Sequence, residues 1–379
     1  MTILYVTAGL AIHGGIERVL VDRINWLAEH DDDEIWLLTV NQFDHPLVFK
    51  LDSRVRLNDL GIGFHRRYRY SGLRRLYEEY KLHKLFQRRL SDEIKKISPH
   101  VISFTQLDFV YDIMKVCGNI PVIFESHSSC LFYKFAKISR LQKLQYRLWI
   151  FMMRKVRTVV TMTQGDAKEW ERFVRNVRVI PNVVHPNETG RMSDCRSRSV
   201  IFVGRYSYQK DIGMLLRIWE LVYQRYPEWQ LHLYSDYGDE QDTLLPRIKS
   251  LNKNVVVHEP TPAIYEKYQN SSILLLTSRF EPFGLVLPEA MSCGLPVVAF
   301  DCPYGPADII SDGVDGFLVR NRNLEEYVEK VCLLMSNEKL RRQMGAKGIS
   351  SSMRYDASNI MPQWKRLYEQ LGNINNTFL

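Results

Sequence analysis

Short runs of aliphatic and β-branched residues alternate with longer stretches of helical periodicity along almost the whole sequence. Most of these runs lack the period-two alternation of half-exposed strands, which is typical of parallel strands buried on both faces. Strands and helices in this order predict an α/β fold with doubly wound parallel sheets. We predict strands at residues 3–7, 35–40, 101–104, 122–125, 158–162, 177–180, 200–203, 230–234, 255–258, 273–276 and 297–300.

A polar stretch from Pro181 to Ser199 interrupts this alternation, which restarts after it. Its prolines, its turn-forming residues and its lack of periodicity indicate a linker. A chain of 379 residues also suits two domains better than one. We therefore predict a Rossmann-like domain at residues 1–185, a second at 186–355, and a helical segment at 356–379 that packs back toward the first domain.

The composition is that of a globular protein, with 45% hydrophobic and 25% charged residues, so both domains can bury a core. No apolar run approaches the ~20 residues that span a bilayer. The N-terminus enters a strand-like run without a basic region or cleavage site, which predicts no signal peptide and a cytoplasmic chain. The six cysteines form no C-x-x-C pair, and we interpret them as reduced, buried thiols rather than zinc ligands.

The excess positive charge lies entirely in the first half of the chain. Residues 1–190 hold 29 Lys/Arg and 21 Asp/Glu, whereas residues 191–379 hold 22 of each. This asymmetry predicts an anionic partner for the first domain, such as a membrane surface or a lipid-linked phosphate.

The strongest chemical signal is the segment Glu281-Pro-Phe-Gly-Leu-Val-Leu-Pro-Glu289, which follows a predicted buried strand. Open α/β sheets bind ligands beyond the carboxyl ends of their strands. Gly284 permits close backbone approach, and a helix that begins near it presents free N–H groups to an anion. Glu281 is then placed to accept hydrogen bonds from sugar hydroxyls, and Glu289, about one and a half turns into the helix, reaches a ribose. The alternative is a loop with two solvated glutamates.

A second signal is Phe202-Val-Gly-Arg205-Tyr-Ser-Tyr-Gln-Lys210, in which two cations follow a strand and precede a helix. A nucleoside diphosphate gains negative charge as it leaves. Cations placed to meet that charge stabilise the transition state more than the ground state. By itself, the pair also fits two surface cations beside a turn.

These two segments, in this order, resemble the donor site of glycosyltransferase family 4. The resemblance continues through Gly305-Pro-Ala-Asp-Ile-Ile and Asp312-Gly-Val-Asp-Gly-Phe-Leu-Val319, and is densest over residues 199–320. It implies the GT-B fold, in which two Rossmann-like domains face each other across an interdomain cleft. It also implies a retaining, metal-independent enzyme.

The resemblance gives the residues of the loop their roles. Glu281 contacts the transferred sugar and Glu289 binds the ribose of the nucleotide. The backbone of Phe283, Gly284 and Leu285 meets the sugar and the phosphate.

Residues outside this loop also receive roles. Arg205 and Lys210 resemble the diphosphate clamp of the family. Gly14 and Gly15 lack the third glycine of a dinucleotide fingerprint, which argues against a dehydrogenase. They resemble the family's N-terminal glycine loop, which faces the donor phosphates and the acceptor. His127, at a predicted strand end, matches a family histidine that lies against the hydroxyls of the donor sugar.

Acidic clusters are the alternative source of charge compensation, because other glycosyltransferases hold a divalent metal. The segment Asp31-Asp-Asp-Glu34 and the residues Asp236 and Asp239 fall in predicted loops, where solvated carboxylates are ordinary. With Arg205 and Lys210 present, we predict no metal and no cofactor.

Two basic segments lie in the first domain. Residues 133–157 hold eight Lys/Arg and no acidic residue, and a second basic stretch occupies residues 66–75. On a helix, Arg140, Lys143, Arg147 and Arg154 share a face beside an apolar stripe of Leu141, Leu144, Leu148 and Phe151. Such a segment can rest on an anionic membrane surface. The alternative is that the stripe belongs to the domain core. No nucleic-acid recognition module is present.

These features predict transfer of a hexose or N-acetylhexosamine from a nucleotide-diphosphate sugar to a lipid-linked or polysaccharide acceptor in bacterial surface glycan synthesis. UDP is favoured over GDP, and the enzyme is expected to be peripheral on the inner face of the cell membrane. A GT-B nucleotide-sugar epimerase and a non-catalytic membrane-associated scaffold remain as alternatives. The segment Pro181-Asn-Val-Val-His185 departs from the family's Pro-Asn-Gly-Val-Asp, which leaves the linker geometry open.

Overall fold

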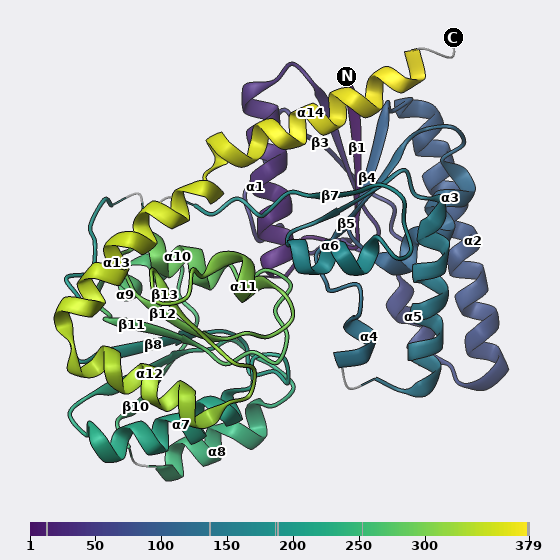
Figure 1. Cartoon of the computed structure of the whole chain (residues 1–379). Helices are drawn as coiled ribbons and strands as arrows, with labels where there is room; N and C mark the ends of the chain where they lie inside the picture. The colour runs from purple at the N-terminus through teal and green to yellow at the C-terminus, as the bar shows by residue number, and fades with distance from the viewer. Residues whose placement is uncertain (13, 136–137, 186, 188, 252, 377–379) are drawn as a thin grey trace.

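Two parallel sheets form the cores of two α/β domains that lie side by side (Figure 1). The computed structural model describes residues 1–12, 14–135, 138–185, 187, 189–251 and 253–376. The first sheet has the strand order β3-β2-β1-β4-β5-β6-β7, and the second has the order β10-β9-β8-β11-β12-β13. In both sheets the order reverses beside the first strand. This confirms the predicted doubly wound α/β class and the GT-B architecture of two Rossmann-like domains.

The first domain contains strands β1 to β7. Its strands are β1 (Thr2–Thr7), β2 (Glu34–Thr39), β3 (Arg56–Asp59), β4 (Val101–Phe104), β5 (Val122–Ser126), β6 (Thr158–Thr161) and β7 (Val177–Val179). Its helices are α1 (Gly15–His30), α2 (Gly72–Ile97), α3 (Val110–Val116), α4 (Phe132–Phe135), α5 (Arg140–Met152) and α6 (Gln164–Trp170), with 3-10 helices η1 (Phe64–Arg69), η2 (Leu107–Phe109) and η3 (Met153–Lys155).

The second domain contains strands β8 to β13. Its strands are β8 (Ser199–Val203), β9 (Gln230–Tyr234), β10 (Val255–His258), β11 (Ile273–Leu276), β12 (Val297–Phe300) and β13 (Gly316–Val319). Its helices are α7 (Ile212–Arg225), α8 (Gln241–Leu251), α9 (Ile264–Gln269), α10 (Val286–Ser292), α11 (Gly305–Ile309), α12 (Leu324–Ser336) and α13 (Glu338–Ser352). The 3-10 helix η4 (Met353–Tyr355) then leads into α14 (Ala357–Asn376).

Apolar side chains fill both faces of each sheet, as β1 illustrates. Leu4 and Val6 belong to the core on one face, whereas Ile3 and Tyr5 belong to the core on the other. Alternate residues of a strand point to opposite faces, so a strand between two helical layers is apolar throughout. This explains why period-two alternation is missing from most of the strands.

All eleven predicted strands are present, with bounds that differ by at most one residue at either end. Two strands were missed. β3 is an edge strand whose residues are partly or largely exposed, and its sequence Arg-Leu-Asn-Asp carries no apolar run. β13 begins with a glycine and is only four residues long. β3 therefore lacks the apolar run that marks most of the others, and β13, although largely buried, offers an apolar run of only three residues after its glycine.

Helix α14 crosses from the second domain back to the first (Figure 1). Its buried residues join the core formed by β1 and α1 in the first domain. Tyr5 of β1 and Tyr368 of α14 are also joined by a 2.7 Å hydrogen bond between their hydroxyl groups. The buried residues of α14 are Ile360, Met361, Trp364, Leu367, Tyr368 and Leu371.

The apolar stripe of α5 is not part of the core. Leu141 and Leu148 are 75% and 56% exposed, and Leu144 and Phe151 are exposed to a similar degree. Tyr146 and Ile150 are the residues of α5 that are buried. The interpretation of the stripe as domain core is therefore wrong. Arg154 lies in η3 after α5 has ended, and Lys137 lies outside the described residues.

The remaining expectations concern thiols and membrane spans. All six cysteines are free and buried, which confirms their interpretation as core thiols. Among the described helices, none combines the length and the apolar character that a bilayer crossing needs.

Candidate donor site

Two loops of the second sheet meet where its strand order reverses, between β8 and β11. β8 ends at Val203, just before Arg205 and Lys210, and β11 ends at Leu276, five residues before Glu281. The carboxyl ends of parallel strands lie at the same edge of a sheet, which is where such sheets bind ligands. The topology thus unites the two segments singled out in the sequence.

Lys210 and Glu281 form an ion pair at this edge, with 2.6 Å between Nζ and Oε2. Their side chains are 15% and 8% exposed, so the pair is largely withdrawn from water. The hydroxyl of Ser278 donates to Oε2 of Glu281 at 3.0 Å, and the amide of Gln209 approaches Oε1 at 3.4 Å. The carboxylate is therefore held in one orientation before any ligand arrives.

Asp211, the residue after Lys210, forms ion pairs with two arginines. Its backbone is left-handed, with φ of 49°, and its carboxylate accepts a hydrogen bond from the amide of Met214 at the start of α7. The same carboxylate pairs with Arg279 at 3.0 Å and with Arg322. The edge of the second sheet is consequently rich in positive charge, and among the described cations Lys210 is the one that pairs with Glu281.

Glu289 is buried and lies where the two domains meet. Its Oε1 is 3.5 Å from Nη1 of Arg18, which belongs to α1 of the first domain. Its Oε2 accepts a hydrogen bond from the hydroxyl of Tyr268 at 3.2 Å. Burial raises the pKa of Glu289, although the charge of Arg18 and the bond from Tyr268 act in the opposite direction.

The helix that carries Glu289 begins later than predicted. α10 starts at Val286, so Glu289 is its fourth residue and lies in the first turn, not one and a half turns in. Gly284 and Leu285 precede the helix as a turn. Gly284 has φ of +95°, a conformation that favours glycine. This left-handed residue delays the helix by two positions.

The backbone of the loop packs closely against α11. A Cβ atom added to Gly305 would lie 1.9 Å from the carbonyl oxygen of Phe283, so only glycine fits there. The ring of Phe283 is buried and meets Tyr355 edge-on at 5.3 Å. These contacts hold the Phe283 to Leu285 backbone in place.

Gly14 and Gly15 bring the first domain against this loop. Gly14 is the residue before α1, and a Cβ atom at Gly15 would lie 3.8 Å from Cδ1 of Leu285. The glycine pair and the donor loop are therefore neighbours across the two domains.

His127 follows β5 and has a side chain only 4% exposed. Its Nε2 lies 3.1 Å from Oε2 of Glu125, a carboxylate buried in the first domain. Burial raises the pKa of Glu125, but the charge of Arg23 and the hydrogen bonds from His127 and Ser103 outweigh it and lower the pKa to about 2. His127 thus lies beside a carboxylate that is ionised at neutral pH.

The predicted site residues fall into three groups. In the first group Lys210 forms an ion pair with Glu281, and in the second His127 contacts Glu125. The third group contains Glu289, Leu285 and the two glycines, where the domains meet. Within the described chain no hydrogen bond or ion pair links His127 to either glutamate of the loop. Arg205 is exposed and makes no ion pair with a described residue. Its predicted role in the clamp is neither supported nor contradicted by a contact.

Among the described residues, no group of three or more His, Cys, Asp or Glu side chains is arranged so that it could hold a metal ion. That the protein needs no metal stays a prediction.

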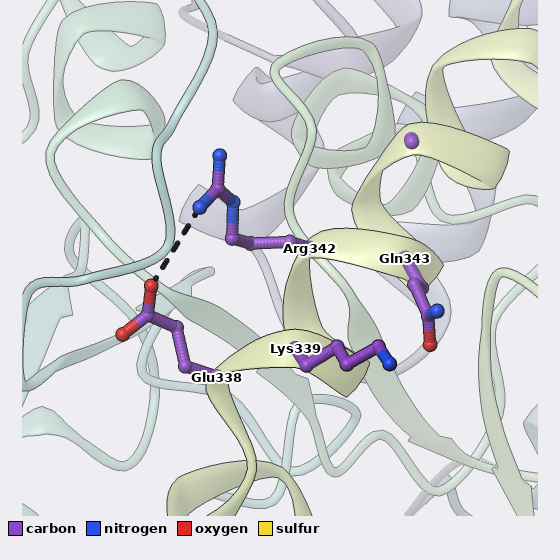
Figure 2. Close-up of a pocket in the computed structure, with 5 residues that line it drawn as sticks. Glu338, Lys339, Arg342 and Gln343 are labelled. Atoms are coloured by element: carbon purple, nitrogen blue, oxygen red, sulfur yellow. Dashed lines mark ion pairs between the residues drawn. The ribbon is translucent and has the colours of Figure 1, made fainter.

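A surface hollow is lined by exposed residues of α13 (Figure 2). Glu338 and Arg342 pair across it at 3.8 Å, and Lys339 and Gln343 point to the other side of the helix. None of the predicted site residues lines this hollow, so we assign it no role in donor binding.

Family models match both halves of the chain. The model described as Glycosyltransferase Family 4 matches residues 13–188, and the model described as Glycosyl transferases group 1 matches residues 191–351. The chain belongs to glycosyltransferase family 4. Both matches cover segments that contain the site described above, with the boundary between them inside the linker.

Two curated relatives of this family 4 chain come from bacteria. The amylovoran biosynthesis glycosyltransferase AmsD of Erwinia amylovora is 33% identical over 228 residues, which are 58% of this chain and 64% of the relative. The poly(ribitol-phosphate) alpha-N-acetylglucosaminyltransferase of Staphylococcus aureus is 28% identical over 219 residues, 56% of this chain and 44% of that one. The chain thus spans less than two thirds of the length of these relatives.

Solved structures share the fold of the family 4 chain. HepE of Anabaena in complex with UDP superposes with a TM-score of 0.75 at 17% identity, over 98% of this chain and 100% of that one. At this identity the likeness shows the fold alone.

Several residues that contact the predicted site residues were missed in the sequence. Arg18 reaches Glu289, and Glu125 and Arg23 support His127. Arg18 follows the glycine pair by three residues, and this proximity was the available signal. Arg23 and Glu125 are 102 residues apart in the sequence, and nothing local marks them as partners.

Proposed function

We propose that the protein is a retaining glycosyltransferase that moves a hexose or N-acetylhexosamine from a UDP-sugar to a lipid-linked or polysaccharide acceptor. The observation that supports this most is the 2.6 Å pair of Lys210 and Glu281 at the strand-order reversal of the second sheet. A largely buried lysine held by a carboxylate is prepared to exchange that carboxylate for a phosphate. Glu281 is then free to accept hydrogen bonds from the donor sugar.

The reaction breaks the bond between C1 of the sugar and the β-phosphate oxygen, and the bonding electrons stay on that oxygen. A new bond forms between C1 and the acceptor hydroxyl oxygen on the same face of the sugar, and the hydroxyl proton passes to the leaving phosphate. Lys210 and Arg205 neutralise the charge that builds on the diphosphate. Because this charge is largest in the transition state, the two cations lower the barrier. Their charge replaces that of a metal ion.

Glu289, His127 and the glycine pair orient the donor in this proposal. Glu289 accepts from the ribose hydroxyls, and His127 meets a sugar hydroxyl. Gly14 and Gly15 leave room for the diphosphate, since neither carries a side chain.

The names of similar proteins support the class of donor and pathway. AmsD is named for amylovoran biosynthesis, the S. aureus relative for N-acetylglucosaminyl transfer to poly(ribitol-phosphate), and HepE was solved with UDP. We therefore assign the protein to the assembly of a bacterial surface glycan.

A thermal-shift panel of UDP, GDP and ADP with EDTA present tests the donor. UDP is expected to raise the melting temperature most, because a ligand that binds only the native state stabilises it by mass action. Equal shifts with all three nucleotides, or a UDP shift that requires a divalent ion, would contradict the proposal.

Transfer itself is tested with Lys210→Met and Glu281→Gln. Each is expected to lower turnover by about 100-fold or more, because an interaction aimed at developing charge is lost. Lys339→Met, on the exposed surface of α13, is the matched control and leaves turnover unchanged. Release of an epimerised UDP-sugar without an acceptor would favour the epimerase. Unchanged function of both variants in cells would favour the scaffold.

We further infer that the first domain rests on an anionic membrane surface. The exposed leucines of α5 lie among Arg140, Lys143 and Arg147, and the first turns of α2 expose Leu73 and Leu76 beside Arg74 and Arg75. Both helices begin at the same end of the domain (Figure 1). Apolar side chains that enter a leaflet, with roughly 1 kcal/mol from each nearby cation, suit such a surface.

Vesicle sedimentation tests this surface. The protein is expected to sediment with vesicles that contain phosphatidylglycerol and not with phosphatidylcholine alone. Leu144→Ser together with Leu148→Ser is expected to weaken sedimentation while the UDP thermal shift is unchanged. Equal binding to both kinds of vesicle would count against the membrane surface.

A further inference from the structure

A buried chain of polar contacts runs from His127 into the interior of the first domain. Oε2 of Glu125 contacts Nε2 of His127 and a guanidinium nitrogen of Arg23, and Oε1 accepts from the hydroxyl of Ser103 at 2.6 Å. The side chains of His127, Glu125 and Arg23 are 4%, 2% and 3% exposed. Burying a salt bridge this deeply costs free energy, because both charges lose their water. Removing one of the two partners destabilises the fold further, because it leaves an unpaired charge in the interior.

The chain ends on α14, the helix contributed by the C-terminus. The guanidinium carbon of Arg23 lies 4.0 Å from the ring centre of Trp364 and 5.6 Å from that of Tyr5. Tyr5 in turn is hydrogen-bonded to Tyr368. Nε of Arg23 is buried and has no hydrogen-bond partner among the described residues, and the face of Trp364 covers the guanidinium.

These contacts join α14 to His127 through two charged residues, although α14 itself does not touch His127 in the described contacts. We propose that Glu125 and Arg23 are positioning residues that fix the orientation and the charge environment of the His127 imidazole. Trp364 holds Arg23, and α14 is thereby part of the donor site rather than only a cover for the first domain. That His127 meets the donor sugar rests on the proposed function; the coupling itself does not.

The charges around His127 make opposite predictions for two variants. Glu125→Gln removes the carboxylate that stabilises positive charge on the imidazole of His127, so the nitrogen-15 signals of the ring shift toward those of the neutral form. Arg23→Met removes the cation that competes for that carboxylate, so the signals shift toward those of the protonated form. A residue that merely filled space would not shift the signals in opposite directions.

Nitrogen-15 NMR of the histidine rings in the ligand-free full chain measures these shifts. His127→Gln identifies the signal. The double variant Arg23→Met with Glu125→Gln guards against a misfolded single variant, because it leaves no unpaired buried charge. Its His127 signal is expected to lie between those of the two single variants, since both the carboxylate and the cation are removed. Shifts in the same direction, or no shift in either single variant, would overturn the proposal.

Asp166 is a further carboxyl group near this strand end. It accepts from the hydroxyl of Ser126 and from the amide of Cys130, and burial raises its pKa to about 7. Its titration overlaps that of a histidine, so Asp166→Asn serves as the control that separates the two. The opposite shifts of the Glu125 and Arg23 variants are expected to persist in this background.

The contribution of α14 is tested by Trp364→Leu, with Leu371→Ala as the matched control. Both remove buried apolar contacts of α14, but only Trp364 faces Arg23. Trp364→Leu is expected to shift the His127 signal in the direction of Arg23→Met and by less, whereas Leu371→Ala leaves it in place. Equal behaviour of the two variants would remove α14 from the proposal.

Turnover separates this inference from the proposed function. If both hold, Glu125→Gln lowers kcat by about 10- to 100-fold with little change in the donor KM, because a misplaced group still permits binding. If the NMR shifts occur and kcat does not change, the coupling stands and the role of His127 in transfer is wrong.

Discussion

At the scale of single residues, the donor loop depends on a position where only glycine fits. Gly305 lies so close to the backbone of Phe283 that a Cβ atom would be 1.9 Å from its carbonyl oxygen. The obstacle is backbone, which cannot rotate aside as a side chain can. The loop that carries Glu281 and Glu289 must therefore move if this residue gains a side chain.

Gly305→Ala is expected to cost about 1–3 kcal/mol of folding free energy, because overpacking against backbone forces the loop away from α11. Gly213→Ala, in α7, is the matched control. The nearest atom to its Cβ is 3.7 Å away, and a helical glycine gains about 0.5–1 kcal/mol on becoming alanine. Urea unfolding measures both, and a Gly305→Ala protein as stable as the parent would contradict this account.

Glu125 gives the stability a defined dependence on pH. Its pKa is about 2 in the folded chain and 4.5 as an ordinary side chain. The unfolded state therefore binds more protons between these values, so the stabilisation is complete above pH 4.5 and is lost as pH falls through 2. The full effect is on the order of 3 kcal/mol. Urea unfolding from pH 2 to 6 is expected to show a smaller loss toward acid in Glu125→Gln than in the parent chain, and equal slopes would exclude this origin.

At the scale of elements, α5 shows that helical periodicity identifies an apolar stripe without telling which way it faces. The helix has two apolar sets, Tyr146 with Ile150 and the four residues of the exposed stripe. Both recur at helical spacing. Only the packing of α5 against α3 and α4 distinguishes the core set from the exposed one.

Alanine substitutions on α5 distinguish the two sets directly. Leu148→Ala is expected to change the unfolding free energy by less than about 0.5 kcal/mol, because Leu148 is already solvated. Ile150→Ala, two residues on and 2% exposed, is expected to cost about 2–5 kcal/mol. Comparable losses in thermal or urea unfolding would mean that the stripe is covered in solution.

At the scale of the whole molecule, α14 unites the two ends of the chain. It starts beyond the second domain and packs on β1 and α1, which are the first elements of the sequence (Figure 1). The first domain therefore cannot complete its core until the last residues are present. The two domains also meet through Arg18 and Glu289, and through the linker residue His185, whose Nε2 is 2.6 Å from Asp22.

Trp364→Ala is expected to destabilise the first domain by about 3–5 kcal/mol, because it removes a large buried ring and the support of Arg23. Arg366→Ala, an exposed position two residues along the same helix, is expected to change little. Intrinsic fluorescence during urea unfolding follows the loss. If both variants unfold at the same urea concentration as the parent chain, Trp364 does not stabilise the core of the first domain.

The local sequence determined eleven of the thirteen described strands and the two chemical segments, because a strand covered on both faces must be apolar and a glycine loop must break it. It also determined that six scattered cysteines are core thiols. Tertiary structure alone decided that the stripe of α5 faces solvent, that α10 begins two residues late, and that Arg18, Arg23 and Glu125 support the predicted site. The physical reason is that these contacts join groups far apart in the chain. Sequence periodicity indicates which residues of one helix or strand share a face. The partner of a charged side chain is determined by how the helices and strands pack together.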